Sequence, residues 1–148
     1  MPIAIRILRT GDEAVLGNVA SGLFDNPIDP KLAAEFLGDH RHHIAVAIHD
    51  GLVVGFASAL HYVHPDKAPQ LWVNEIAVAR QYRRQGLAKA VLRALFEVGR
   101  AQRCTVAWVL TDRTNVAAMA LYSSVGGIEG ADEEGPCDGT LGYRFVLG

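Results

Sequence analysis

A basic turn followed by a glycine is the part of the sequence best suited to bind an anion. Arg83-Arg84-Gln85-Gly86-Leu87-Ala88 comes after an apolar stretch, residues 76–78, and opens a segment with helical periodicity, residues 86–101. The first turn of a helix leaves backbone N–H groups unpaired, and together with the helix dipole they attract anions. Gly86 lets a bulky anion approach the backbone, and the arginines add positive charge. The pattern predicts a phosphate or diphosphate site, although it has neither the Walker nor the dinucleotide-binding glycine spacing.

A second polar and aromatic segment follows the next predicted strand. Thr114 or Asn115 caps a predicted helix that runs through Tyr122 and Ser123, and Gly126-Gly127 terminates it. On its own, Asn115 is typical of a helix cap, and Tyr122 is typical of a half-buried core aromatic. Taken alone, neither residue therefore identifies a ligand site.

The elements that position these motifs alternate in a mixed order. Apolar patterning predicts strands at residues 3–9, 43–49, 52–62, 71–79 and 104–110, helices at 11–22, 30–38, 86–101 and 115–123, and a final antiparallel hairpin. Thr10 and Glu13 are in capping-box register for the first helix, and Asp50-Gly51 predicts a tight hairpin. The order β-α-α-β-β-β-α-β-α-β-β predicts one α+β domain over residues 1–148 with a mixed sheet.

The two motifs together resemble those of the GNAT (Gcn5-related) N-acetyltransferases. Arg83-x-x-Gly86-x-Ala88 follows a strand ending in Glu75-Ile76-Ala77-Val78, and Asn115-x-x-Ala118-x-x-Leu121-Tyr122 comes one helix and one strand later. The resemblance covers roughly residues 43–127. It implies an acetyl-CoA-dependent N-acetyltransferase with a three-layer α/β/α fold, whose mixed, mostly antiparallel sheet contains a splayed central strand pair.

The resemblance also implies a role for each matched residue. The diphosphate of acetyl-CoA is expected on the backbone N–H groups of residues 84–88, and the pantetheine arm alongside residues 76–78 like an added strand. The amide of Val78 would stabilise the developing oxyanion, and Tyr122 would protonate the departing thiolate. Asn115 would contact the pantetheine amides. The expected cofactor-binding residues are thus Ile76, Ala77, Val78, Arg83, Arg84, Gln85, Gly86, Leu87, Ala88 and Asn115.

An attacking amine must first lose a proton, and Glu75 is the first candidate for the base. It is a carboxylate in an otherwise apolar strand, three residues before Val78, and partial burial there is expected to raise its pKa. The alternative is a structural carboxylate paired with an arginine or a backbone amide. His61, Tyr62 and His64, expected to face the same slot, offer a second base or contacts to the substrate.

Three further histidines surround Arg41. His40, His42 and His43 have no carboxylate or cysteine spaced with them as metal ligands would be. We therefore interpret this segment as a solvated strand entrance, and no metal is expected.

The acceptor is expected to be a small cationic amine. Leu23-Phe24-Asp25 together with residues 73–78 is similar to the GNAT-type aminoglycoside 3-N-acetyltransferases, in which an acidic residue at the position of Glu75 is the base. Asp25 would then contact the substrate together with Glu75, His61, Tyr62 and His64. The alternatives are a protein or peptide amine, a polyamine, or a non-catalytic acyl-CoA-binding module.

An acidic stretch near the C-terminus fits a cationic acceptor. Residues 114–143 contain no lysine or arginine, but they contain Glu129, Asp132, Glu133, Glu134 and Asp138. An acidic rim attracts polycations, although an ordinary solvated hairpin has the same composition.

Composition excludes several other classes of protein. The 148 residues are 50% hydrophobic and carry a net charge of −2, which excludes a disordered chain and argues against a nucleic-acid binder. Cys104 and Cys137 are the only cysteines, which argues against a disulfide scaffold and a zinc site. No signal peptide or long apolar run is apparent, so a cytoplasmic protein that does not bind a membrane is expected. A homodimer is expected from the resemblance alone.

Overall fold

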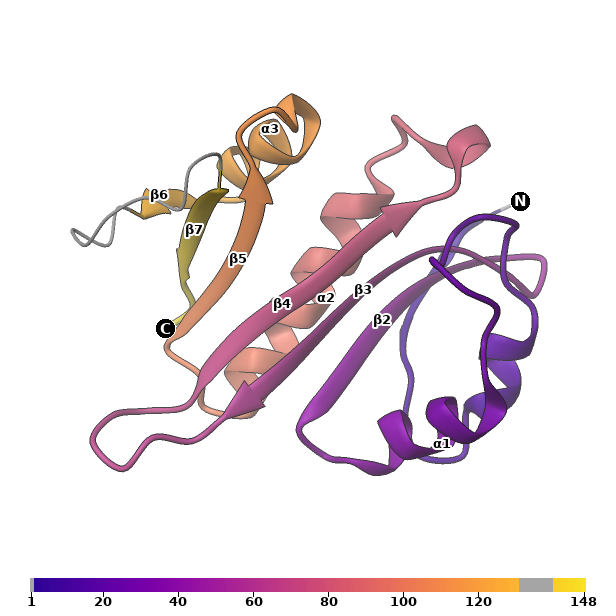
Figure 1. Cartoon of the computed structure of the whole chain (residues 1–148), viewed down its shortest axis with the longest axis horizontal. Coiled ribbons are helices and arrows are strands. Elements are labelled where there is room, and N and C mark those ends of the chain that lie inside the picture. The colour runs from indigo at the N-terminus through magenta and orange to yellow at the C-terminus, as the bar shows by residue number, and fades with distance from the viewer. Residues whose placement is uncertain (1, 131–139) are drawn as a thin grey trace.

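A seven-stranded sheet organises the part of the chain that the structure describes (Figure 1). The computed structural model describes residues 2–130 and 140–148. The elements are, in order, β1 (Ala4–Ile7), η1 (Glu13–Gly17), α1 (Pro30–Gly38), β2 (His42–His49), β3 (Leu52–Tyr62), β4 (Gln70–Val78), η2 (Arg80–Tyr82), α2 (Leu87–Ala101), β5 (Val106–Asp112), α3 (Val116–Ser124), β6 (Ile128–Gly130) and β7 (Thr140–Val146).

The sheet is mixed and mostly antiparallel, with the strand order β1-β2-β3-β4-β5-β7-β6. Among the strands described, β4 and β5 alone pair in parallel. Helices α2 and α3 pack on one face, where Phe96 of α2 and Tyr122 of α3 both contact Phe145 of β7. Helix α1 covers part of the other face. The predicted α+β class and three-layer arrangement are confirmed.

Burial on both faces explains the long apolar strands. The central residues of β2 and β3 are buried without interruption, because α1 and α2 cover opposite faces of these strands. Helix α2 contributes a buried stripe of Leu87, Val91, Leu92, Leu95 and Phe96, the side that periodicity predicts. The core therefore lies between α2 and the centre of the sheet.

The predicted helix at residues 11–22 is wrong. Only Glu13–Gly17 forms a 3₁₀ helix, and Thr10 donates its hydroxyl to the carbonyl of Leu37 instead of capping it. The chain beyond it pairs with the start of β3: Val53 donates to the carbonyl of Asn18, and Ala20 donates to the carbonyl of Val53. These tertiary hydrogen bonds end the helical turn. Helix α1 begins as predicted, with Asp29 at its N-cap accepting from the N–H of Lys31.

The part of the chain that the structure describes contains no helix long and apolar enough to span a membrane. Four of the five acidic residues predicted to form a rim, Asp132, Glu133, Glu134 and Asp138, lie outside the described residues.

Candidate active site

Strands β4 and β5 pair for only part of their length and then diverge (Figure 1). Gln70 to Val73 pair with Val106 to Val109, but both strands continue further. On the other side of β4, Ser58 is opposite Glu75 while Ala59 is opposite Val73, so Asn74 is an extra, bulged residue. The bulge lies where the β4–β5 pairing stops. This is the splayed strand pair that the resemblance implied.

Beyond the bulge, β4 turns unpaired backbone groups away from β3. The N–H of Ala79 donates to the carbonyl of Val54 at 2.8 Å. Because backbone groups alternate along a strand, the N–H groups of Ile76 and Val78 point to the side of β5. No acceptor for these two groups is present among the described residues. This edge of β4 can therefore pair with an extended ligand.

The turn that follows β4 gathers further unpaired N–H groups. Arg84 and Gly86 have left-handed backbones, with φ of +64° and +77°, and Gly86 is the N-cap of α2. Within the described part of the chain, the N–H groups of residues 84–89 have no hydrogen-bond acceptor. They combine with the positive end of a 15-residue helix dipole. The geometry suits a diphosphate.

Gly86 is required by its backbone angle and not by crowding. A Cβ built at this position would meet no atom within 4 Å. The guanidinium of Arg83 donates from Nε to the carbonyl of Val78 at 3.1 Å, which fastens the turn to the end of β4. Leu87 is buried and anchors the start of α2, whereas Arg84 and Gln85 are exposed.

A hydrogen bond that has no signal in the sequence holds the turn from its other side. The ring Nδ1 of His49, at the end of β2, lies 2.7 Å from the hydroxyl of Tyr82 in η2. The other ring nitrogen of His49 lies 3.7 Å from the carboxylate of Asp50. This contact joins the β2–β3 hairpin to the residues just before the turn.

Asn115 and Tyr122 lie at opposite ends of α3. Asn115 is the helix cap that its type suggested: its side-chain oxygen accepts from the N–H of Ala118 at 3.0 Å. Tyr122 is buried, with its ring 5.3 Å from that of Tyr143. Burial, with a smaller contribution from Tyr143, raises the pKa of the Tyr122 hydroxyl. The hydroxyl therefore keeps its proton at neutral pH, as an acid must before it donates.

Glu75 and Asp25 line one cavity of about 340 Å³ beside α1. Glu75 is exposed, so the expected partial burial is wrong: it lies just after the bulge at Asn74, where β4 is no longer paired with β5. Neither carboxylate has an ion-pair or hydrogen-bond partner among the described residues. The alternative of a structurally paired Glu75 has no support there.

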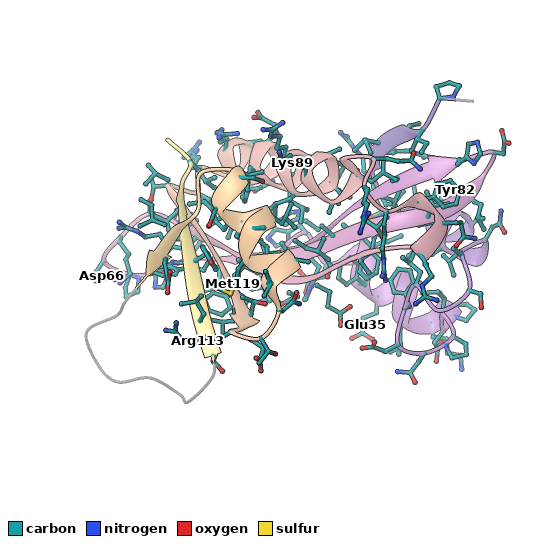
Figure 2. The ribbon with its side chains drawn as sticks, turned by 90° about the horizontal axis from the view of Figure 1, so that it is seen from above. Glu35, Asp66, Tyr82, Lys89, Arg113 and Met119 are labelled. Atoms are coloured by element: carbon teal, nitrogen blue, oxygen red, sulfur yellow. The ribbon has the colours of Figure 1, made fainter. Side chains whose placement is uncertain are left out.

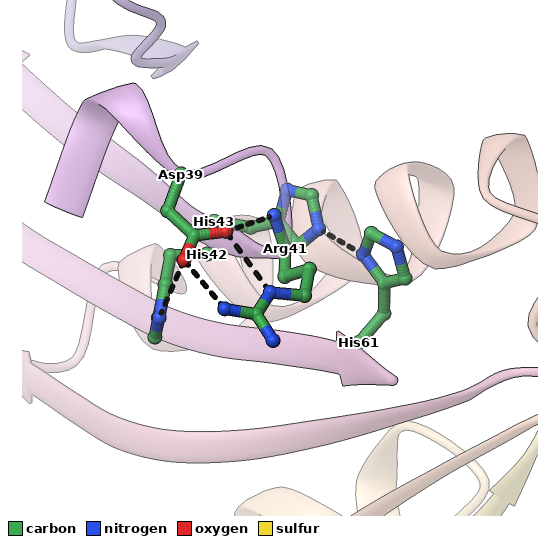
Figure 3. A network of polar contacts seen from close by, with 5 residues as sticks. All are labelled: Asp39, Arg41, His42, His43 and His61. Carbon is green, nitrogen blue, oxygen red and sulfur yellow. Dashed lines mark hydrogen bonds and ion pairs between the residues drawn. The ribbon is translucent and has the colours of Figure 1, made fainter. Parts of the chain in front are cut away.

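The structure separates His61 from this cavity. Successive strand residues alternate between faces, so His61 lies on the opposite face of β3 from the cavity-lining Ser58. Its ring Nδ1 lies 2.7 Å from Nε2 of His43 (Figure 3). The expectation that His61 faces the same slot as Glu75 is therefore wrong.

Burial disfavours the charged form of both histidines in this pair. Burial, and secondarily the neighbouring His61, lower the pKa of His43 to about 4. Burial also lowers the pKa of His61. The prediction of a solvated strand entrance fails at His43, which is buried, but holds for Arg41, whose guanidinium pairs with Asp39 (Figure 3).

Tyr62 and His64 also lie away from the cavity. Their rings are 5.0 Å apart at the end of β3 and the start of the following loop, and neither lines the cavity of Asp25 and Glu75. The loop they lead into carries Asp66, at the end of the molecule opposite Tyr82 (Figure 2). A substrate contact by these two residues stays a prediction.

Comparisons with known proteins agree on one family. The sequence matches the model of the acetyltransferase (GNAT) family over residues 18–126. It is 31% identical over 96 residues to N-acetyltransferase 8 of Rattus norvegicus, covering 64% of this chain and 43% of that protein. It is 30% identical over 96 residues to N-acetyltransferase 8 of Homo sapiens, covering 64% of this chain and 42% of that protein. The chain thus spans less than half the length of these curated relatives.

Solved structures show the same fold at low sequence identity. The ribosomal-protein-S18-alanine N-acetyltransferase of Escherichia coli has a TM-score of 0.69 and 24% identity, covering 99% of this chain and 94% of that one. An aminoglycoside acetyltransferase from an uncultured soil metagenomic sample has a TM-score of 0.72 and 23% identity, covering 88% of this chain and 95% of that one. A chain of a NatC complex bound to Gag peptide and CoA has a TM-score of 0.73 and 18% identity, covering 100% of both chains.

Proposed function

The chain belongs to the GNAT acetyltransferase family, and we propose that it transfers the acetyl group of acetyl-CoA to the primary amine of a small cationic acceptor. One observation carries the proposal: the unpaired N–H groups of residues 84–88 lie directly beyond the unpaired edge of β4. The first set fits a diphosphate, and the second fits the amides of an extended pantetheine chain.

The residues of β4 orient the thioester. In our proposal the backbone of Ile76 pairs with the pantetheine arm, and the N–H of Val78 points at the thioester carbonyl. A preorganised N–H in this place stabilises the negative charge that develops on the carbonyl oxygen. Asn115 retains its amide nitrogen for a contact to the same arm, since its oxygen caps α3.

Glu75 and Tyr122 are proposed to move the two protons of the transfer. Glu75 takes a proton from the acceptor ammonium, directly or through one water, and the amine nitrogen then forms a bond to the acetyl carbon. As the carbon–sulfur bond breaks, the Tyr122 hydroxyl gives its proton to the departing thiolate. The raised pKa of Tyr122 keeps that proton available. The attacking nitrogen then loses its second proton, which restores the Tyr122 hydroxyl through water, and Glu75 releases the first proton to solvent.

An aminoglycoside is one acceptor that this proposal includes. The fold is shared with an aminoglycoside acetyltransferase, and the carboxylates of Asp25 and Glu75 attract ammonium groups. A peptide or protein amine is the alternative, supported by the shared fold of the S18-alanine N-acetyltransferase and of the NatC complex. A homodimer in the cytoplasm remains part of the proposal on the resemblance alone.

Release of free thiol from acetyl-CoA tests the proposed function. We expect release that depends on added primary amine and saturates with it. Glu75→Gln should lower kcat/KM by about a hundredfold, because it removes the base. Glu35→Gln is the matched control: Glu35 is an exposed carboxylate on α1 that does not line the cavity (Figure 2), so its loss should change nothing. Equal effects of the two substitutions would contradict the role of Glu75.

A further inference from the structure

The cavity beside Glu75 has walls that are mostly apolar. Its described lining includes Phe24, Ile28, Leu32, Phe36 and Phe56. The rings of Phe24 and Phe56 stack in parallel, with centroids 4.0 Å apart. Phe56 is only 2% exposed, so the half-buried ring of Phe24 carries the accessible face of this stack. It is a flat surface that binds apolar groups and offers no hydrogen bond.

Leu32 extends this apolar wall onto α1. Its relative exposure is 63%, although it is a large aliphatic residue that lines a cavity together with half-buried phenylalanines. Helix α1 is fixed at this point, because the Asp29 carboxylate accepts from the N–H groups of Lys31 and Leu32. The backbone that carries the exposed leucine is thus fixed by the helix cap.

The charges in the cavity suit a single ammonium group. Among the described residues, the carboxylates of Asp25, Asp29 and Glu75 line it, and no lysine or arginine does. Asp29 is already engaged as the cap of α1. Two carboxylates therefore remain for a cation. Of the other described lining residues, only Asn26 and Ser58 have polar side chains, so most of the wall offers no partner to a hydroxyl group.

From this lining we infer that the preferred acceptor is a small primary amine that carries an apolar alkyl or aromatic group next to its nitrogen. The inference rests on the proposed function and names the acceptor class of the same site. The ammonium lies by Asp25 and Glu75, and the apolar group contacts Leu32 and the stacked phenylalanines. A hydroxyl-rich polycation is disfavoured, because burying unpaired hydroxyls costs free energy.

A series of unbranched amines tests the inference. We expect kcat/KM to rise roughly fourfold for each methylene from ethylamine to hexylamine, since each buried methylene contributes a similar increment. The isosteric 2-(2-aminoethoxy)ethanol has the length of hexylamine but two oxygens, and it should react at least tenfold more slowly. Kanamycin should react more slowly still.

Two variants on α1 test whether the preference for longer amines depends on the Leu32 side chain. Leu32→Gln should lower kcat/KM for hexylamine about fivefold more than for ethylamine, because only the longer amine reaches the wall. Ala34→Gln, also exposed on α1 but outside the cavity lining, should leave the ratio of the two amines unchanged.

Several results would overturn the inference. One is a kcat/KM that does not rise from ethylamine to hexylamine. Another is a higher kcat/KM for kanamycin or for 2-(2-aminoethoxy)ethanol than for hexylamine. A third is the same hexylamine-to-ethylamine ratio of kcat/KM in Leu32→Gln and Ala34→Gln. Coenzyme A binding without turnover of any amine in the series would overturn it as well. Failure of the proposed function is separate, since it would appear as no binding of coenzyme A in calorimetry before any amine is added.

Discussion

Replacing Gly86 by alanine separates the cost of the backbone angle from the binding of the coenzyme. The angle φ is +77°, and a Cβ would meet no atom within 4 Å, so the substitution adds no steric clash. Holding a non-glycine residue in the left-handed region costs about 1–2 kcal/mol. Gly86→Ala should therefore lower the free energy of unfolding by about that amount.

The same substitution should weaken coenzyme A binding. Alanine disfavours the left-handed angle, so the free turn relieves part of this strain by relaxing toward a negative φ. The N–H groups on either side then rotate away from the diphosphate, and binding must restore the strained angle. Losing one hydrogen bond to a charged group costs about 1.5–3 kcal/mol, which corresponds to an increase in Kd of about ten- to a hundredfold. Isothermal titration with coenzyme A measures the Kd, and urea unfolding measures the stability.

Gly11→Ala is the matched control. Gly11 has a φ of +97° and equally open surroundings, and it lies beyond the end of β1 that pairs with Ala45, away from His49 and Tyr82. It should lose similar stability and bind coenzyme A as the unmodified protein does. Gly86→Asn should lose less stability and less affinity for coenzyme A than Gly86→Ala, because asparagine tolerates this backbone angle. The reasoning is refuted if Gly86→Ala loses stability but keeps its Kd.

Three further predictions concern groups around the site and in the core. Tyr122→Phe keeps the buried ring but removes the proton donor, so kcat should fall about a hundredfold while the Kd for coenzyme A stays the same; an unchanged kcat would exclude the acid role. Tyr82→Phe removes the 2.7 Å hydrogen bond to His49, so the KM for acetyl-CoA should rise about two- to tenfold, and by more than kcat falls; an unaltered KM would show that this contact does not position the turn. The pKa of His43 is about 4 in the folded protein and about 6.5 in the unfolded chain. Between these pH values the unfolded chain therefore binds more protons than the folded protein does. The free energy of unfolding should fall by about 1–3 kcal/mol as the pH drops from about 6.5 to 4. Urea unfolding midpoints measured across this pH range test the prediction. His43→Asn should make the stability depend less on pH, and a dependence as steep as in the unmodified protein would assign it to other groups.

Local signals made most of the fold predictable. Asp50 and Gly51 adopt left-handed angles of 49° and 78°, as a tight hairpin requires, and the two strands they join begin and end within a residue of the predicted bounds. Helix α2 shows its buried side directly in its periodicity. The prediction failed at residues 11–22, because hydrogen bonds to Val53, more than thirty residues away, decide that backbone.

The candidate site was predictable in its backbone and less so in its side chains. The turn after β4 depends on a glycine and a helix start, both of which can be recognised in the sequence. The exposure of Glu75 depends on a bulge at Asn74 that has no sequence signal. The pairing of His43 with His61 depends on the register of β2 against β3, which places residues 18 positions apart in contact. Contacts of this kind follow from strand register and not from residue type.

A crystal structure of the protein with coenzyme A is the most direct test of how the turn and strand work together. We predict diphosphate oxygens within hydrogen-bond distance of N–H groups among residues 84–88, and the pantetheine arm paired with the free edge of β4 at Ile76 and Val78. A coenzyme bound elsewhere, or bound through side chains alone while those N–H groups stay empty, would contradict this.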